Sequence, residues 1–320
     1  MKLNGLHHVT AVTAKAQDNF NFYTQVLGMR LVKKTVNQDD VSAYHLFYAD
    51  KLGSPGTDLT FFDWRIGPNR NGPGSIANTA LRVPNHAALV WWADYLRRGG
   101  LEHSGLVEFH GHELINFTDP EGQQLSLVND EGAAGRGAPW EKSHIPAEYA
   151  IGGLYASTLI VRQLGPTERV LTEVMGYERS AEYETAANEQ TVVYELAGGG
   201  AGRELWVIEQ PDRPYGQLGA GGVHHIAFRV ADREAQRYWR ERLVSYGLGV
   251  SDFIDRFYFR SIYYRIPGGI LFEIATDGPG FTADEDPATL GEQLALPPFL
   301  EPQRARIEAG LKPLRTVTAA

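Results

Sequence analysis

Two histidine pairs stand at matching places in the sequence, each at the start of a strand-like stretch. The first pair is His7-His8 and the second is His224-His225, and a glycine precedes each pair by two residues. One such pair is more often structural than a ligand set, because neighbouring residues of a strand point to opposite faces. Two copies in repeated units change this expectation. If the units pack about a pseudo-twofold axis, His8 and His225 can point into one cavity, with His7 and His224 close by.

A single carboxylate is available to complete a metal site. Glu273 lies in the otherwise apolar strand-like run 271–275. Burying an unpaired carboxylate costs several kcal/mol, so Glu273 needs a cationic partner. The alternative to a metal is an ion pair with Arg256 or Arg265. The corresponding position of the second repeated unit is Ser126, so the acid belongs to one unit and is not a general feature of the repeat.

Two neutral imidazoles and one carboxylate on one face of a metal leave about three positions open. This ligand set suits non-haem Fe(II) chemistry with O2, and Zn²⁺ or Mn²⁺ would fit the same ligands. The chain has no cysteine. Thiol nucleophiles, cysteine-ligated zinc and cysteine-ligated iron–sulfur clusters are therefore excluded.

The composition indicates a soluble cytoplasmic protein. The net charge of −9 and the pI near 5.6 disfavour nucleic acid as the main partner. The first eight residues do not resemble a signal peptide, and no apolar run approaches the ~20 residues that cross a bilayer. We therefore expect no membrane partner, and self-association of the chain stays open.

The elements that must position these residues form a fourfold repeat. A strand, a helix and about three further strands recur near residues 3–64, 76–130, 150–210 and 222–277. Helices are predicted near residues 16–26, 87–98, 165–174 and 233–245, each followed by a glycine. The pattern predicts modules one and two in 1–131, a linker in 132–149, modules three and four in 150–281 and a tail in 282–320. Because His8 lies in module one and His225 and Glu273 in module four, these two modules should form one metal-binding barrel. Modules two and three should form a second barrel without metal.

These residues give the chain a resemblance to the vicinal oxygen chelate superfamily, which includes glyoxalases and extradiol dioxygenases. Within it, the chain is most similar to ring-cleaving dioxygenases of the hydroquinone type. The resemblance rests on five stretches: 5–10, 222–227, 255–265, 271–281 and 296–302. It implies an α+β fold in which four βαβββ modules pair into two cupped barrels. It further implies that His8, His225 and Glu273 bind Fe(II), and that His7, Thr10, His224, Arg256 and Tyr263 surround the substrate and O2.

The resemblance also implies roles for the surrounding residues in cleavage of a hydroquinone- or catechol-like ring by O2. His224 or His7 would exchange a proton with the substrate hydroxyl or the bound oxygen. Tyr263 would hydrogen-bond that oxygen, or else be a half-buried strand tyrosine. Arg256 would hold a developing oxyanion or the far hydroxyl, or else be a surface or Glu-paired arginine. Thr10 is more readily explained as an ordinary strand residue.

The other histidines give weaker signals. His110 and His112 alternate on one strand of module two, which is compatible with a metal, but that module lacks a matching acid. The remaining four are interpreted as surface or loop residues: His45, His86, His103 and His144. Two other functions stay open. One is a glyoxalase-like isomerase or lyase, which generally uses two carboxylates. The other is a non-catalytic resistance protein that binds aromatic compounds, which would not need an intact ligand set.

Overall fold

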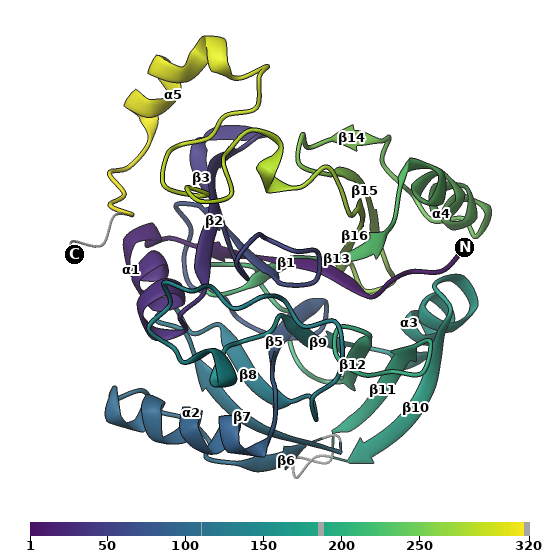
Figure 1. Cartoon of the computed structure of the whole chain (residues 1–320). Helices are drawn as coiled ribbons and strands as arrows, with labels where there is room; N and C mark the ends of the chain where they lie inside the picture. Colours follow the sequence, from purple (N-terminus) through teal and green to yellow (C-terminus); the bar gives the residue numbers. More distant parts are fainter. Residues whose placement is uncertain (110, 185–188, 317–320) are drawn as a thin grey trace.

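The computed structural model of the chain describes residues 1–109, 111–184 and 189–316. Within these residues the chain builds four modules with the order strand, helix, three strands (Figure 1). This is the predicted α+β class, and the prediction of a fourfold βαβββ repeat is confirmed.

The modules follow one another along the chain. Module one contains β1 (Leu6–Thr13), α1 (Ala16–Asn21), η1 (Phe22–Val26), β2 (Arg30–Asn37), β3 (Asp40–Ala49) and β4 (Asp58–Asp63). Module two contains β5 (Ser75–Val83), α2 (His86–Arg98), β6 (Val107–Phe109), β7 (His112–Thr118) and β8 (Gln124–Asn129). Module three, after the short η2 (Ala147–Tyr149), contains β9 (Leu154–Val161), α3 (Leu164–Arg169), η3 (Val170–Val174), β10 (Tyr177–Glu184), β11 (Gln190–Leu196) and β12 (Glu204–Glu209). Module four contains β13 (Val223–Val230), α4 (Arg233–Ser245), β14 (Ile254–Asp255), β15 (Arg260–Arg265) and β16 (Leu271–Thr276).

Strand pairing joins the first module to the fourth and the second to the third. β1 runs antiparallel to β13, and β5 runs antiparallel to β9. In every module the last strand returns parallel to the first, as β4 does to β1 and β16 does to β13. Modules one and four form the upper half of the molecule in Figure 1, and modules two and three form the lower half. The two halves touch at the sheet through one register pair, Val223 and Ile76.

The helices of modules two and four differ from those of modules one and three in how they begin and end. Asn85 and Asp232 are the N-cap residues of α2 and α4, and their side chains accept hydrogen bonds from the backbone N–H three residues further along the chain. In modules one and three the predicted single helices instead end in π-helical turns, η1 and η3. At both places a threonine hydroxyl, Thr24 or Thr172, donates to the carbonyl four residues earlier. Such back-bonding competes with the helical ladder and locally distorts it.

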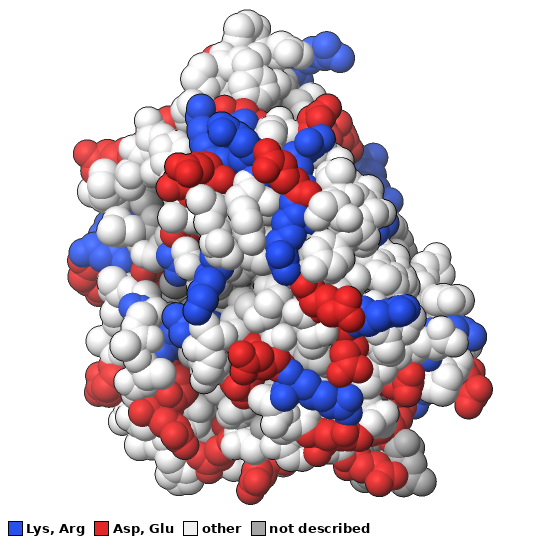
Figure 2. Space-filling view, turned by 90° about the vertical axis from the view of Figure 1, so that its right-hand side faces the viewer, with Lys and Arg blue, Asp and Glu red and all other residues white. Residues whose placement is uncertain are grey.

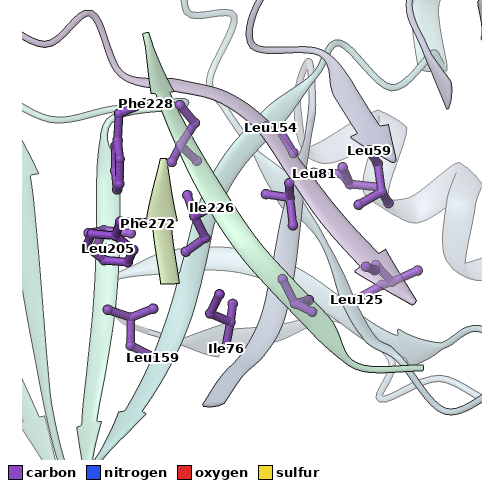
Figure 3. Packing of buried hydrophobic residues seen from close by; sticks show 14 of the residues in the cluster. Leu59, Ile76, Leu81, Leu125, Leu154, Leu159, Leu205, Ile226, Phe228 and Phe272 are labelled. Atoms are coloured by element: carbon purple, nitrogen blue, oxygen red, sulfur yellow. The ribbon is translucent and has the colours of Figure 1, made fainter. Parts of the chain in front are cut away.

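The main hydrophobic core draws on all four modules. Figure 3 shows leucine, isoleucine and phenylalanine side chains of β4, β5, β8, β9, β12, β13 and β16 packed together. Labelled members such as Leu81, Leu205 and Phe272 are fully buried. The packing supports the central strands, β1 and β13, which carry the histidine pairs.

The chain after module four folds back over module one. It contains the short helices η4 (Phe281–Ala283), η5 (Glu301–Gln303) and α5 (Arg304–Gly310), drawn in yellow-green and yellow in Figure 1. The buried ammonium of Lys33 on β2 contacts Asp284 and Glu285, and Lys312 contacts Asp63 of β4 at 2.7 Å. These ion pairs fix the tail beside the half that contains the histidine pairs.

The surface has mixed charge. On the face shown in Figure 2, acidic and basic side chains are interspersed, and no extended basic area is visible. Among the described residues, no helix has both the length and the apolar character needed to span a membrane.

Candidate metal centre

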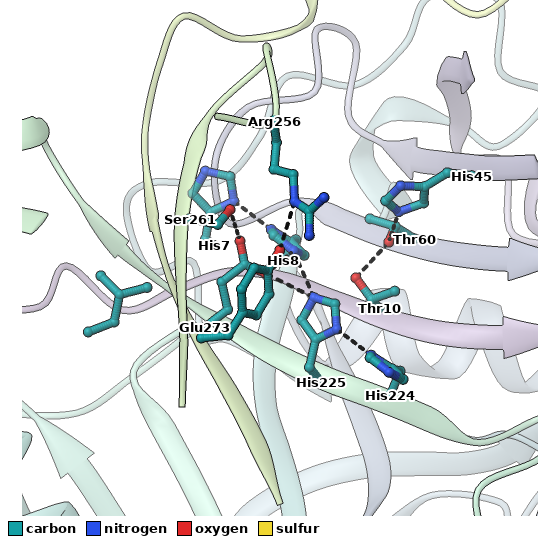
Figure 4. Close-up of polar contacts among 12 residues, drawn as sticks. His7, His8, Thr10, His45, Thr60, His224, His225, Arg256, Ser261 and Glu273 are labelled. Carbon is teal, nitrogen blue, oxygen red and sulfur yellow. Dashed lines mark hydrogen bonds and ion pairs between the residues drawn. The ribbon is translucent and has the colours of Figure 1, made fainter. Parts of the chain in front are cut away.

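Three side chains from three neighbouring strands converge inside the upper half. His8 of β1, His225 of β13 and Glu273 of β16 are 2%, 3% and 0% exposed (Figure 4). Their Nε2 and carboxylate atoms all lie within 4.8 Å of one another. Glu273 Oε2 is 3.3 Å from His8 Nε2 and 2.9 Å from His225 Nε2, and the two Nε2 atoms are 3.4 Å apart. The arrangement presents two nitrogens and one oxygen to a common point.

The chemistry of these donors fits a divalent cation. Glu273 Oε2 is fully buried and has no hydrogen-bond partner among the described residues, despite its two short contacts. A buried carboxylate oxygen in that situation costs free energy, which a bound cation would recover. Glu273 does not pair with Arg256 or Arg265, which was the alternative to a metal; its charged contacts are the two imidazoles.

Protonation also favours metal binding. Burial alone would raise the pKa of the Glu273 carboxyl, but the adjacent imidazoles of His8 and His225 outweigh burial and hold the pKa well below its usual range. Burial lowers the pKa of His225, and the attraction of Glu273 offsets this only in part. An ionised carboxylate beside a neutral imidazole is the form in which these groups act as ligands.

In each histidine pair, the first residue contacts the ring nitrogen of the second that does not face the common point. Nδ1 of His7 is 2.9 Å from Nδ1 of His8, and Nδ1 of His224 is 2.8 Å from Nδ1 of His225. With Nε2 of each ligand turned to the common point, the network assigns the proton to the ligand Nδ1, which donates to the preceding histidine. His7 then donates from Nε2 to the carbonyl of Thr276 at 3.2 Å. Burial, followed by the neighbouring ligand, lowers the pKa of both His7 and His224 to about 3.

Sequence reasoning missed Ser261, which orients the carboxylate. Its hydroxyl donates to Glu273 Oε1, leaving Oε2 for the common point. Ser261 lies on β15, which runs antiparallel to β16, and is fully buried. The only sequence signal is a small polar residue two positions before Tyr263, the residue that pairs directly with Glu273.

Arg256 and Tyr263 stand together at one side of the centre. Arg256 Nε donates to the Tyr263 hydroxyl at 3.3 Å, and its two Nη atoms lie 3.1 and 2.9 Å from the Asp39 carboxylate. Burial would lower the pKa of Arg256, but Tyr263 and Asp39 outweigh it and raise the pKa. Burial, followed by Glu273, raises the pKa of Tyr263, so its hydroxyl is protonated and can donate.

The interpretation of His45 as an ordinary surface or loop residue is wrong. Its imidazole lies on β3 inside the upper half and lines the same cavity as the metal-ligand candidates. Its Nε2 is 2.9 Å from the Thr60 hydroxyl, which is 2.8 Å from the hydroxyl of Thr10. Burial, followed by His8 and His225, lowers the pKa of His45 well below its usual value. Thr10 thus belongs to a hydrogen-bonded chain that ends at His45.

The cavity beside the candidate ligands is narrow and is lined by both aromatic and polar side chains. Phe47, Phe62, Tyr258, Phe259 and Tyr263 contribute to its wall, and we place its mouth at the lining residue Asp39, which is exposed and contacts Arg256. It measures about 40 Å³. A cavity that binds benzene measures roughly 150 Å³, so a ring enters only when the mouth residues move.

The lower half carries different residues at the equivalent strand positions. The register that relates His8 to His225 relates Asn78 to Ala156, and the position of Glu273 is taken by Trp206. Tyr155 and Trp206 belong to a small hydrophobic cluster in this half. Among the described residues, His8, His225 and Glu273 form the one group arranged to hold a metal.

The remaining histidines lie elsewhere. His112 pairs with the buried Glu204 at 2.9 Å, and His110 lies outside the described residues. His86 and His144 are exposed, with His86 in contact with Glu113 at 2.7 Å, and His103 is half-buried.

The paired βαβββ halves around a buried His–His–carboxylate cluster define the class of protein, which is a paired-module protein of the glyoxalase type. The family model described as "Glyoxalase/Bleomycin resistance protein/Dioxygenase superfamily" matches residues 5–127 and 155–274. The chain belongs to this superfamily, also called vicinal oxygen chelate.

Full-length relatives are named as ring-cleaving enzymes. The chain is 45% identical over 316 residues to the "Putative ring-cleaving dioxygenase MhqA" of Bacillus subtilis (strain 168), covering 98% of this chain and 100% of that protein. It is 33% identical to the chlorohydroquinone/hydroquinone 1,2-dioxygenase of Sphingobium indicum, covering 94% and 93% of the two chains.

Solved structures support the fold. A crystal structure described as a "putative dioxygenase" from Bacillus subtilis subsp. subtilis str. 168 superposes with a TM-score of 0.91 at 39% identity and covers 99% of both chains. Glyoxalase I from Zea mays shares the fold, with a TM-score of 0.62 at 12% identity over 85% of this chain and 92% of that one.

Proposed function

We propose that the protein is an Fe(II)-dependent dioxygenase that cleaves a dihydroxylated aromatic ring, a hydroquinone or a catechol, with O2. The observation that carries the proposal is the buried trio His8, His225 and Glu273, which opens onto an aromatic-lined cavity. The trio occupies one side of a metal and leaves the other side for reactants. The names of the full-length relatives support the same reaction class.

Fe(II) bound by His8, His225 and Glu273 would supply the electron transfer that lets O2 react with the ring, and would hold both reactants next to each other. We propose Fe(II) as the native metal; Mn²⁺ or Zn²⁺ fits the same donors and can replace it in a recombinant sample.

The chain's own residues would bind and orient the ring. The protonated Tyr263 hydroxyl would donate to a substrate oxygen in the cavity, and Arg256 would place a positive charge beside it, where negative charge develops on oxygen. Phe47 and Phe62 present apolar surface to the ring and keep water out. His7 and His224 hold the tautomer and orientation of the two ligand imidazoles. In this arrangement His7 and His224 influence the reaction by positioning His8 and His225. A direct exchange of a proton with the substrate is the other role that we propose for them.

We also propose that the two halves of the molecule have different roles. Modules one and two span residues 1–131 and modules three and four span 150–281, joined by 132–149 and followed by the tail 282–320. The half built from modules one and four carries the chemistry, and the half built from modules two and three supports it.

Two other functions on this fold have less support. A glyoxalase-like isomerase generally uses two carboxylates, and the trio here contains one. A non-catalytic protein that binds aromatic compounds would gain nothing from a buried carboxylate whose second oxygen lacks a hydrogen-bond partner.

The test is O2 consumption by protein reconstituted with Fe(II) under anaerobic conditions. The panel contains hydroquinone, methyl- and chlorohydroquinone, and catechol. We expect O2 uptake with loss of the aromatic absorbance, and none when Zn²⁺ replaces Fe(II). No uptake from any ring, with one iron bound per chain, would refute the proposal and favour the isomerase or the binding protein.

A further inference from the structure

His45 is a polar residue of the cavity that lies on β3, two strands from β1. On β3 it pairs in register with Thr35 of β2 and Phe62 of β4. Its ring centroid lies 4.0 Å from that of Phe47 and 4.4 Å from that of Phe62, so aromatic packing fixes the imidazole plane. The side chain lines the cavity that contains His8, His225 and Glu273.

The pseudo-twofold relation between modules one and four explains this placement. β16 pairs with β13 as β4 pairs with β1, which makes Thr60 the counterpart of Glu273. By the same register His45 on β3 is the counterpart of Ser261 on β15. Ser261 hydrogen-bonds Glu273, and His45 hydrogen-bonds Thr60. His45 therefore lies on the opposite wall of the site from the carboxylate (Figure 4).

One ring nitrogen of His45 is available. Nε2 contacts the Thr60 hydroxyl, while Nδ1 has no hydrogen bond to any described residue. Arg256, a second polar residue of the lining, already donates to Tyr263 and Asp39. His45 thus brings an unpartnered nitrogen to a cavity lining in which aromatic rings alternate with polar residues, among them Thr35, whose buried hydroxyl also lacks a partner among the described residues. A polar atom in such a lining stabilises a ligand that supplies the missing partner and disfavours one that does not.

We propose that Nδ1 of His45 hydrogen-bonds the ring hydroxyl that points away from the metal, so that the site selects a 1,4-dihydroxylated ring over a 1,2-dihydroxylated one. The two hydroxyls of a catechol are adjacent and both turn toward the ligand trio, leaving His45 without a partner. The second hydroxyl of a hydroquinone lies across the ring from the first and reaches the opposite wall. With Nε2–H donating to Thr60, Nδ1 accepts from that hydroxyl. This selection rests on the proposed ring-cleaving function.

Two substitutions separate recognition from support of Thr60. In His45→Asn the amide can occupy the position of Nδ1, whereas in His45→Gln it can occupy the position of Nε2 and keep the contact with Thr60. We expect His45→Gln to lower kcat/KM for hydroquinone about tenfold or more, and that for catechol less than about threefold. His45→Asn should keep the preference for hydroquinone. His45 has only a structural role if His45→Gln keeps the preference for hydroquinone over catechol and His45→Asn loses it. The same conclusion follows if both variants lower kcat/KM for the two substrates by the same factor.

A binding measurement distinguishes failure of this inference from failure of the proposed function. Calorimetry with the Zn²⁺-loaded protein compares hydroquinone with phenol, which lacks the second hydroxyl. We expect the wild type to bind hydroquinone about tenfold more tightly than phenol, and His45→Gln to bind them equally. Equal binding of both ligands by the wild type would overturn the inference even if the enzyme cleaves rings. The expected binding difference without ring cleavage by the iron-loaded wild type would refute the proposed function alone.

Discussion

Replacement of Glu273 by glutamine tests the ligand trio through stability as well as activity. Burial lowers the pKa of His225, so at pH 8 its imidazole is neutral and offers the Glu273 carboxylate no compensating charge when metal is absent. Its Oε2 also lacks a hydrogen bond among the described residues. We therefore expect Glu273→Gln to lower the free energy of unfolding of the metal-free protein by less than about 1 kcal/mol. A metal at a hundredfold excess over its dissociation constant stabilises the wild type by about 2.7 kcal/mol, or roughly 5 °C. The variant should lose this gain.

The lower half offers a matched control, because Glu204 is also a buried glutamate. Its carboxylate is surrounded by donors: His112 Nε2 and Trp206 Nε1 at 2.9 Å, and the Tyr155 hydroxyl at 3.2 Å. Glu204→Gln should lower the free energy of unfolding by about 1–3 kcal/mol and leave the metal-dependent gain intact. The assay is thermal unfolding of both variants with and without Fe(II) under argon. A Glu273→Gln protein that keeps the full metal-dependent gain would remove Glu273 from the ligand set.

Three further predictions follow from the surroundings of the trio. The pKa of His7 is about 3 in the folded protein against about 6.5 unfolded, so the unfolded chain binds more protons and stability falls as pH drops from 6.5 toward 3. The free energy of unfolding should fall by about 4 kcal/mol over this range through His7 alone. Urea unfolding of the metal-free protein at several pH values should therefore show a smaller fall for His7→Asn than for the wild type. Parallel plots of the free energy of unfolding against pH would contradict this prediction. Ser261→Ala frees Glu273 Oε1 and should weaken metal binding about tenfold, measured by competition with a chelator, whereas unchanged affinity would show that the hydroxyl does not orient the carboxylate. Asp39 is 72% exposed, so Asp39→Asn should change stability by less than about 1 kcal/mol. It should also speed ring binding in stopped-flow mixing, because Arg256 is released at the mouth; an unchanged rate would place the entrance elsewhere.

The repeated architecture could be predicted because its signals are local. Each helix has apolar residues at helical spacing and a glycine after it, and the histidine pairs mark equivalent strands. The π-helical turns could not be predicted, since they depend on whether the hydroxyls of Thr24 and Thr172 bond backward along the helix. The proximity of His8, His225 and Glu273 followed from the pseudo-twofold argument and needed no knowledge of side-chain packing.

His45 and Asp39 show where sequence reasoning fails. Most of β3 is buried on both of its faces, so its alternation of residues does not reveal that His45 turns toward the cavity. Asp39 is 217 residues from Arg256 in the chain, and only the packing of module one against module four brings them together. The candidate ligands were identifiable by their residue types, whereas these cavity residues depend on tertiary packing.

The central claim is that both atoms of O2 enter the ring-opened product. The most direct measurement is mass spectrometry of the product formed by the Fe(II)-loaded protein from hydroquinone under isotopically labelled O2. The account predicts a ring-opened product that carries both labelled oxygen atoms, formed by the wild type and absent with Glu273→Gln. An unopened ring, or an opened product whose carboxylate carries no labelled atom, would contradict it; the aldehyde oxygen is scored only after immediate reduction, because it exchanges with water.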